Sequence, residues 1–277
     1  MRIDLHVHTT ASDGLLAPSA LIREMAGAGV QVIGVTDHDT VDGLECALAA
    51  ARRAAVTLVP GVELSAYWGR IEFHLLGYAI DPAHEPLAAF LRGTREARHA
   101  RMQAMVNRLW AMGIPVPVAE VFDAASNGNV GRPHLARVLQ RHGVVETLDE
   151  AFNRYLGTDR PAYVPRPDVA VAEAIRVIHQ AGGLAVLAHP GLQGRDDALP
   201  DLLAAGLDGI EVYHPKHGSG LVSRYRRLAA RHRLLVTGGS DFHGAPDRAY
   251  GLLPGRPGLP EVEFARFSEA IRVRQAG

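Results

Sequence analysis

Ile3-Asp4-Leu5-His6-Val7-His8-Thr9-Thr10-Ala11-Ser12-Asp13-Gly14 is the stretch on which the interpretation of the whole chain depends. Its apolar and polar residues alternate, and a period of two is typical of a β-strand with its apolar side chains on one face. His6 and His8 are two residues apart, so both imidazoles lie on the same face. Two imidazoles side by side at a strand end can chelate one cation. Taken alone, the stretch is equally compatible with an ordinary surface strand that carries two histidines.

The composition limits the class of protein. The chain has 277 residues, 47% hydrophobic and 21% charged, so we expect one large α/β domain, or one domain with an insertion, and a sizeable core. The net charge of -1 argues against a broad positive electrostatic field that would attract nucleic acid or a membrane surface. A single cysteine, Cys46, allows neither an internal disulfide nor a cysteine zinc site. Without a signal-peptide segment or a spanning apolar run, we expect a cytoplasmic protein with no membrane association and no obligate protein partner.

Strands and helices alternate over the first 80 or so residues and again after about residue 168. Strands are predicted at 32–36, 56–64, 71–78 and 209–214 and, together with their exit segments, at 184–190 and 234–243, and helices are predicted between most of them. Histidines and carboxylates recur in these strands or at their ends: they are His38, Glu63, His74, His189, Asp241 and His243. Repeated strand–helix units with such residues at strand ends indicate a parallel barrel or a close relative.

Residues 86–167 break this alternation. A long helix is predicted from Leu87 to Met112, with arginines at 92, 95, 98, 101 and 108, and short helices separated by Gly and Pro follow it. We expect a small helical insertion domain over 86–167, with the barrel formed by 1–85 and 168–277. The arginine face could follow an RNA backbone, although a solvated helix balanced by acidic residues is the simpler interpretation.

The candidate metal ligands are all histidines or carboxylates: His6, His8, Asp13, His38, Glu63, His74, His189, Asp241 and His243. One cation takes roughly four to six ligands, counting waters, so this set indicates two or three metal ions with one bridging carboxylate. Ligation by N and O without thiolate suits Mn²⁺, Zn²⁺ or Fe²⁺, and such clusters support phosphoryl transfer. Three of the nine have simpler interpretations: His74 as a core histidine, His189 as a strand cap, and Asp13 as a turn residue before Gly14.

Five short motifs, in order along the chain, resemble those of the PHP (polymerase and histidinol phosphatase) family. They are His6-x-His8, Thr36-Asp37-His38-Asp39, Gly61-Val62-Glu63, Ala188-His189-Pro190 and Ser240-Asp241-Phe242-His243-Gly244. The resemblance covers residues 1–80 and about 168–277. It implies an α/β fold, a distorted (β/α)7 barrel of the PHP type, with a phosphoesterase site of two or three divalent metals. We expect Mn²⁺, with Zn²⁺ or Fe²⁺ as alternatives.

The resemblance also implies how the ligands are divided. One metal would be held by His6, His8, Glu63 and Asp241; Glu63 would bridge to a second, also held by His74 and His189; Asp13, His38 and His243 would hold a third. A hydroxide that bridges the metals would attack phosphorus in line. Glu63, Asp241 and His243 are therefore the expected catalytic residues.

Two further stretches carry cations suited to substrate binding. Gly131-Arg132-Pro133-His134 opens a predicted helix whose free N–H groups can bind an anion, unless it is a plain helix start. Tyr213-His214-Pro215-Lys216-His217-Gly218 follows a strand and contains the only lysine. The candidate substrate-binding residues are Arg132, His134, Arg160, His214 and Lys216. Several separate cations beside a metal site indicate a substrate with more than one phosphate.

Within the PHP family, these two stretches resemble small phosphoesterases that act on nucleoside 3′,5′-bisphosphates or trim short 5′-phosphorylated RNA. The resemblance implies release of the 3′-phosphate of pAp to give AMP, with 5′→3′ exoribonuclease activity on short RNA as the alternative. A histidinol-phosphate-type phosphatase, a C–N amidohydrolase and a metal-binding module without chemistry are less favoured. An amidohydrolase lacks a clear carbamylated lysine here, since Lys216 lies in a basic loop, and the full ligand set counts against an inert module.

Overall fold

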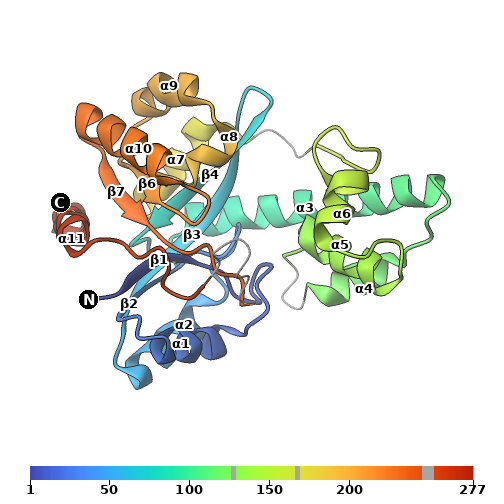
Figure 1. Cartoon of the computed structure of the whole chain (residues 1–277), viewed down its shortest axis with the longest axis horizontal. Coiled ribbons are helices and arrows are strands. Elements are labelled where there is room, and N and C mark those ends of the chain that lie inside the picture. Colours follow the sequence, from blue (N-terminus) through green and yellow to red (C-terminus); the bar gives the residue numbers. More distant parts are fainter. Residues whose placement is uncertain (126–128, 166–168, 245–252, 277) are drawn as a thin grey trace.

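A seven-stranded sheet forms the core of the left-hand part of the molecule in Figure 1. The structure is a computed structural model that describes residues 1–125, 129–165, 169–244 and 253–276. The strands lie side by side in chain order: β1 (Ile3–Val7), β2 (Val32–Val35), β3 (Thr57–Trp68), β4 (Ile71–Tyr78), β5 (Leu184–Leu187), β6 (Gly209–Tyr213) and β7 (Leu235–Gly238). Neighbouring strands are parallel except in the β3–β4 and β4–β5 pairs, so β4 alone runs against the others of this sheet.

The first strand meets the segment that follows the last one, and this contact closes the sheet into a distorted barrel. Val7 forms a parallel bridge with Phe242. The Asp241 N–H donates to the carbonyl of His6 at 2.9 Å, and the His8 N–H donates to the carbonyl of Phe242 at 2.9 Å. Gly239 permits the close approach, because a Cβ there would lie 2.4 Å from the Cβ of His6. The predicted distorted (β/α)7 barrel is confirmed.

Helices cover the outside of the barrel (Figure 1). They are α1 (Pro18–Gly27), α2 (Leu44–Ala54), α7 (Val171–Gln180), α8 (Pro190–Gln193), α9 (Leu199–Ala204) with the short turn η2 (Asp196–Ala198), α10 (Ser219–His232) and α11 (Glu261–Ala276). The apolar side chains of β1 are buried in the main core, and its polar residues are buried too. His6 reaches across to Glu63 of β3 and Glu211 of β6. The polar face of β1 therefore points into the barrel.

The helices between β4 and α7 gather to one side of the barrel (Figure 1). They are α3 (Glu85–Ala111), α4 (Val118–Ala124), α5 (Arg132–Arg141), α6 (Leu148–Ala151) and the π-helical turn η1 (Phe152–Leu156). The start of α3 places Leu87 and Leu91 in the barrel core. The second half of α3 belongs to a separate hydrophobic cluster, whose buried members in the described chain all lie between Met102 and Ala162. The boundaries of the predicted insertion over 86–167 stay a prediction: Leu87 and Leu91 belong to the barrel core, and residue 167 lies outside the described residues.

The arginines of α3 are engaged within the molecule. Arg98, 5% exposed, pairs with Asp39, and the Nε of Arg101, 6% exposed, donates to the carbonyl of Val164 at 2.6 Å. Arg92 and Arg95 pair with carboxylates, and Arg108 donates to the carbonyl of Tyr163. The prediction of a solvated helix is wrong for Arg98 and Arg101, and these contacts count against a free arginine face for RNA. None of the described helices has the length and hydropathy needed to cross a bilayer.

Candidate metal centre

The predicted ligands are far apart in the sequence but meet at one end of the barrel. His6 and His8 come from β1 and its exit, His38 follows β2, Glu63 lies in β3 and His74 in β4. His189 follows β5, whereas Asp241 and His243 follow β7. The carboxyl ends of parallel barrel strands face the same side, which explains why residues at successive strand exits converge.

Glu63 lies at the middle of the cluster and is fully buried. Its Oε1 is 2.8 Å from Nδ1 of His74 and 3.0 Å from Nε2 of His189. Its Oε2 is 3.2 Å from Nε2 of both His6 and His8, and 3.1 Å from Nδ1 of His38. The two oxygens therefore face two different groups of imidazoles, as a bridging carboxylate requires. The assignment of His74 as a metal ligand stays a prediction.

His6 and His8 converge on a second carboxylate as well. Their Nε2 atoms are 3.1 Å apart, and they lie 3.5 Å and 3.2 Å, respectively, from Oδ1 of Asp241. Both histidines are 0% exposed, so the surface-strand interpretation of the opening stretch is wrong. Ring nitrogens and a carboxylate oxygen that point at a common position form a donor set suited to a divalent ion.

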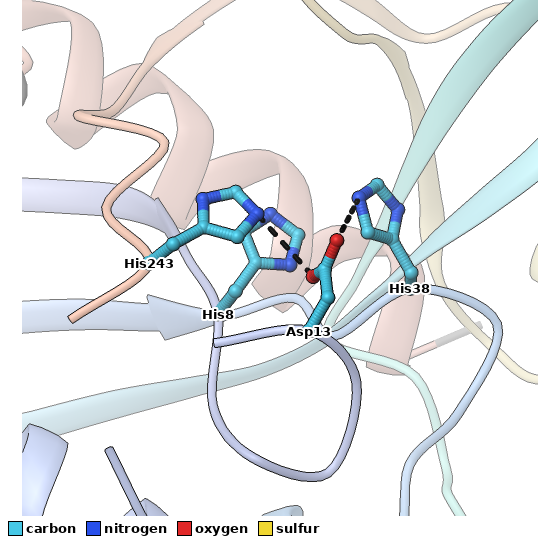
Figure 2. A group of neighbouring side chains, drawn as sticks. All are labelled: His8, Asp13, His38 and His243. Atoms are coloured by element: carbon cyan, nitrogen blue, oxygen red, sulfur yellow. Dashed lines mark ion pairs between the residues drawn. The ribbon is translucent and has the colours of Figure 1, made fainter. Parts of the chain in front are cut away.

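Asp13 lies between two histidines from other loops, as Figure 2 shows. Its Oδ1 is 3.3 Å from Nε2 of His243, and its Oδ2 is 3.9 Å from Nε2 of His38. His8 stacks on His243 with ring centroids 4.2 Å apart, and it belongs by distance to the same group. His8 and His38 thus each lie between two groups of donors. Their assignment to single metal positions stays a prediction.

Five of the nine metal-ligand candidates and a cation share one cavity. It has a volume of about 250 Å³ and is lined by His38, Glu72, His74, Arg132, His189, Leu192, Gln193, Asp241 and His243. Arg132 is the first residue of α5, and its guanidinium lies 5.8 Å from the ring of Phe152 and 5.7 Å from that of Tyr163. Its Nη2 is 3.5 Å from Oε2 of Glu72. The insertion therefore contributes a positive charge to a cavity that the barrel furnishes with donors for metal ions.

The other predicted substrate residues lie in different surroundings. His134 is buried, and its Nδ1 accepts the Gly131 N–H at 3.0 Å, so it caps the start of α5. Burial lowers its pKa, which leaves it neutral. His214 is buried with Nε2 3.4 Å from Oδ2 of Asp241, and its Nδ1 accepts the Lys216 N–H. Arg160 and Lys216 are exposed.

Comparison with known proteins identifies the family. The PHP domain model matches residues 4–114. Over 251 residues the chain is 39% identical to the 3′,5′-nucleoside bisphosphate phosphatase of Chromobacterium violaceum, with 87% of each protein covered. The chain belongs to the PHP family. It is also 37% identical over 247 residues to the 5′-3′ exoribonuclease Rnm of Salmonella typhimurium, covering 87% of this chain and 84% of that protein.

The structural comparison agrees. An amidohydrolase from C. violaceum, solved with bound sulfate and no metal, has a TM-score of 0.85 and 35% sequence identity, over 96% of this chain and 97% of that one. The predicted family and reaction class are confirmed: this PHP protein is a hydrolytic phosphoesterase. Its buried imidazole and carboxylate donors fit divalent metal ions, which such an enzyme uses.

Burial and charge have opposite effects on the pKa values of the candidate ligands. Burial alone would raise the pKa of Glu63, but the charges of His38, His6 and His74 hold it well below its usual range. Burial would lower the pKa of His8, but hydrogen bonds to Asp241 and Glu63 raise it to about 10. The charge of Glu63 likewise raises the pKa of His74 to about 9 against its burial. For His38 burial prevails and lowers the pKa to about 3. These contacts therefore favour ionised carboxylates beside protonated His8 and His74, whereas His38 is neutral.

Two buried carboxylates behind the ligands were not singled out from the sequence. Glu211 lies 2.9 Å from Nδ1 of His6 and accepts the His189 N–H at 2.8 Å. Asp37 accepts from Thr9 N–H at 2.7 Å, from its hydroxyl at 2.7 Å and from Ser12 Oγ at 2.6 Å, which fixes the loop that leads to Asp13. Such contacts orient metal ligands. A charged residue inside an otherwise apolar strand, as in Ile210-Glu211-Val212, was the available signal.

Proposed function

We propose that this PHP protein removes the 3′-phosphate from nucleoside 3′,5′-bisphosphates and converts pAp to AMP, with two or three divalent ions and Mn²⁺ as the metal. The observation that carries the proposal is Arg132, which enters the cavity of the metal-ligand candidates from the insertion. A cation separate from the metal positions suits a substrate with a second phosphate. The named C. violaceum relative supports the same substrate class.

The proposed roles follow from the positions of the side chains. Metal ions held by these residues would supply an activated water and would neutralise charge at the phosphoryl group. Glu63 fixes the spacing of two positions, because one oxygen faces His74 and His189 while the other faces His6, His8 and His38. Asp241 would hold the same metal ion as His6 and His8, and Asp13, His38 and His243 would hold a third. Water adds hydroxyl to phosphorus and returns a proton to the departing 3′-oxygen.

Arg132 takes the remaining phosphate in this proposal. Its guanidinium can form two parallel hydrogen bonds to one phosphate, which fixes the substrate's orientation as well as adding affinity. Glu72, 3.5 Å away, holds the guanidinium at the cavity in the absence of substrate. Exposed Arg160 and Lys216 are the further proposed phosphate contacts. The burial of His134 and His214 favours supporting roles beside α5 and Asp241.

A second candidate is 5′→3′ exoribonuclease activity on short 5′-phosphorylated RNA. The S. typhimurium relative with that name, 37% identical, favours it. Both reactions cleave a phosphate ester at a 3′-oxygen and leave a 5′-phosphate elsewhere on the substrate. A single cavity with metal positions and Arg132 can therefore serve both.

A screen of substrates tests the proposal. Phosphate or nucleotide release by the Mn²⁺-loaded protein is measured with pAp, AMP, p-nitrophenyl phosphate and a short 5′-phosphorylated RNA. We expect kcat/KM for pAp to exceed that for AMP by about 10- to 100-fold, since a hydrogen bond to a charged group contributes about 1.5–3 kcal/mol. Equal values for all phosphomonoesters would contradict the bisphosphate proposal. A higher value for the RNA than for pAp would establish the exoribonuclease as the main activity.

A further inference from the structure

Three residues of the insertion contact two barrel loops that carry metal-ligand candidates. Nη2 of Arg137, in α5, donates to the carbonyl of Asp13 at 2.8 Å. The amide of Asn129 donates to the carbonyl of His38. Arg98 of α3 pairs with the carboxylate of Asp39, the residue after His38. These donors bind the chain at or next to Asp13 and His38, and they do not use the side-chain atoms of these two residues that would bind metal.

The Asp13 loop transmits this contact to a second ligand. The carbonyl of Thr9 accepts the N–H groups of Ser12 and Gly14, so the loop turns back on itself just after β1. The Leu15 N–H donates to the carbonyl of His243 at 2.8 Å. Asp37 holds the barrel side of the loop, and Arg137 holds the opposite side at the carbonyl of Asp13. A shift of this loop would therefore move the ligand atoms of Asp13 and the backbone of His243 together.

The His38 loop is anchored between β3 and the insertion. Asp39 has a left-handed backbone with φ of 48°, and its Oδ1 accepts the Ser65 N–H at 2.8 Å. Its Oδ2 accepts from Nε of Arg98 at 2.8 Å, and Nη1 of Arg98 donates to the carbonyl of Val130 at 3.2 Å. Both charged groups are buried, so loss of one partner would leave the other unpaired at high cost. This pair fixes the strained residue next to His38.

We propose that the helical insertion is a clamp that sets the geometry of the Asp13–His38–His243 metal position. This inference rests on the proposed division of the ligands into positions. The donors around Glu63 that come from His6, His74 and His189 are held by barrel residues, with Glu211 behind two of them. Only the Asp13 and His38 loops carry the contacts from Arg137, Asn129 and Arg98 described above. Under that division the insertion holds the loops of one position directly, whereas its Arg132 reaches the second only through Glu72, which lies 3.7 Å from Nε2 of His74.

The arrangement also links this position to the substrate. Arg132 and Arg137 lie on the same helix, α5, so one helix contacts both the cavity and the Asp13 loop. A change that moves α5 alters the phosphate contact and the Asp13–His38–His243 position together.

Metal counting on a clamp variant tests the inference. Arg137→Met keeps much of the aliphatic stem but removes the donor to Asp13. Metal-free protein is titrated with Mn²⁺ alone, and bound metal is counted by inductively coupled plasma mass spectrometry after desalting. Loss of a residue that orients a ligand costs about 10- to 100-fold in metal affinity, so we expect about one Mn²⁺ per chain to be lost on desalting while the rest is retained. Asp13→Asn alters a ligand of this position directly, so the Mn²⁺ that it loses per chain gives the loss expected when the position is empty. The double variant Arg137→Met/Asp13→Asn should lose no more Mn²⁺ than Asp13→Asn alone.

Two further variants keep the result unambiguous. Arg141→Met removes an exposed guanidinium on the same helix, 3.9 Å from Glu120, and is expected to retain the full metal content. Asn129→Ala removes the contact to His38 and should reproduce the selective deficit where Arg137→Met does not fold. Full metal content in both Arg137→Met and Asn129→Ala, or uniform weakening of every position, would overturn the clamp. Because the count needs no substrate, a selective deficit supports the clamp even where pAp is not hydrolysed.

Discussion

Oε1 of Glu211 lies 2.9 Å from Nδ1 of His6, and both side chains are fully buried inside the barrel. An ionised carboxylate can only accept at this distance, so it holds the proton on Nδ1 and leaves Nε2 free to face Glu63 and Asp241. The other oxygen of Glu211 accepts the N–H of His189, whose φ of 26° is unusual for a residue with a side chain. One carboxylate thus orients a ligand from each of two groups around Glu63.

Glu211→Gln should weaken metal binding without removing a ligand. The glutamine amide has nearly the same shape as the carboxylate, but it is uncharged. Its NH₂ group cannot accept a hydrogen bond, so it cannot accept from both the His6 ring and the His189 N–H. We expect about 10- to 100-fold weaker Mn²⁺ binding at the positions of His6 and His189, measured by titration of the metal-free protein. Glu269→Gln, which changes an exposed glutamate of α11, is the matched control. Wild-type affinity in Glu211→Gln would show that Glu211 only fills space.

Glu63→Gln should affect more than one metal position. The bridging oxygens contact both groups of imidazoles, so we expect the loss of about two Mn²⁺ per chain, against the loss of about one in Asp13→Asn. The metal-free variant should also unfold more readily, since removing one partner of a buried charge network costs about 3–5 kcal/mol. Metal counting and urea unfolding in the presence of a chelator measure the two effects. Loss of a single metal would argue against a bridge.

Metal loading should release protons. Without metal, contacts with carboxylates raise the pKa of His8 to about 10 and that of His74 to about 9, so both imidazoles are protonated near neutral pH. A metal binds the neutral ring, so affinity should increase as the pH rises toward about 9 and decrease as it falls. Calorimetric titration with Mn²⁺ in two buffers of different ionisation enthalpy measures the number of protons released. A value near zero at neutral pH would contradict the protonated state of these histidines.

The same pKa shifts give the metal-free protein a characteristic pH dependence. A histidine whose folded-state pKa is raised contributes stability that is complete below about 6.5 and is lost as the pH rises through the folded value. In the presence of a chelator, the Tm should therefore fall between about pH 7 and pH 10. The lowered pKa values of Glu63, Asp13 and Asp241 contribute stability that is lost only as the pH falls into the acid range. A Tm that rises over the alkaline range would contradict this account.

Local pattern predicted the barrel and the convergence of the ligands, because period-two alternation and strand exits are properties of neighbouring residues. His6, Glu63 and Asp241 were found in this way. Glu211 was not, since its contact with His6 spans 205 positions and exists only once β6 lies across from β1. The sequence likewise favours a solvated Arg98, because nothing near it in the chain shows that it pairs with buried Asp39.

Arg132→Met should discriminate a substrate contact from a structural one. The guanidinium lines the cavity near the rings of Phe152 and Tyr163, and it contacts Glu72 rather than any metal-ligand candidate. We expect kcat/KM for pAp to fall by about 10- to 100-fold, because a charge-assisted contact of about 1.5–3 kcal/mol is lost, while Mn²⁺ content and hydrolysis of p-nitrophenyl phosphate change little. Arg132→Lys keeps the charge but not the paired donors, so its kcat/KM for pAp should be intermediate.

Arg154→Met, on the exposed side of η1, is the matched control for Arg132→Met. If Arg132→Met lowered the metal content and left the preference for pAp over p-nitrophenyl phosphate unchanged, Arg132 would support the site rather than bind the second phosphate.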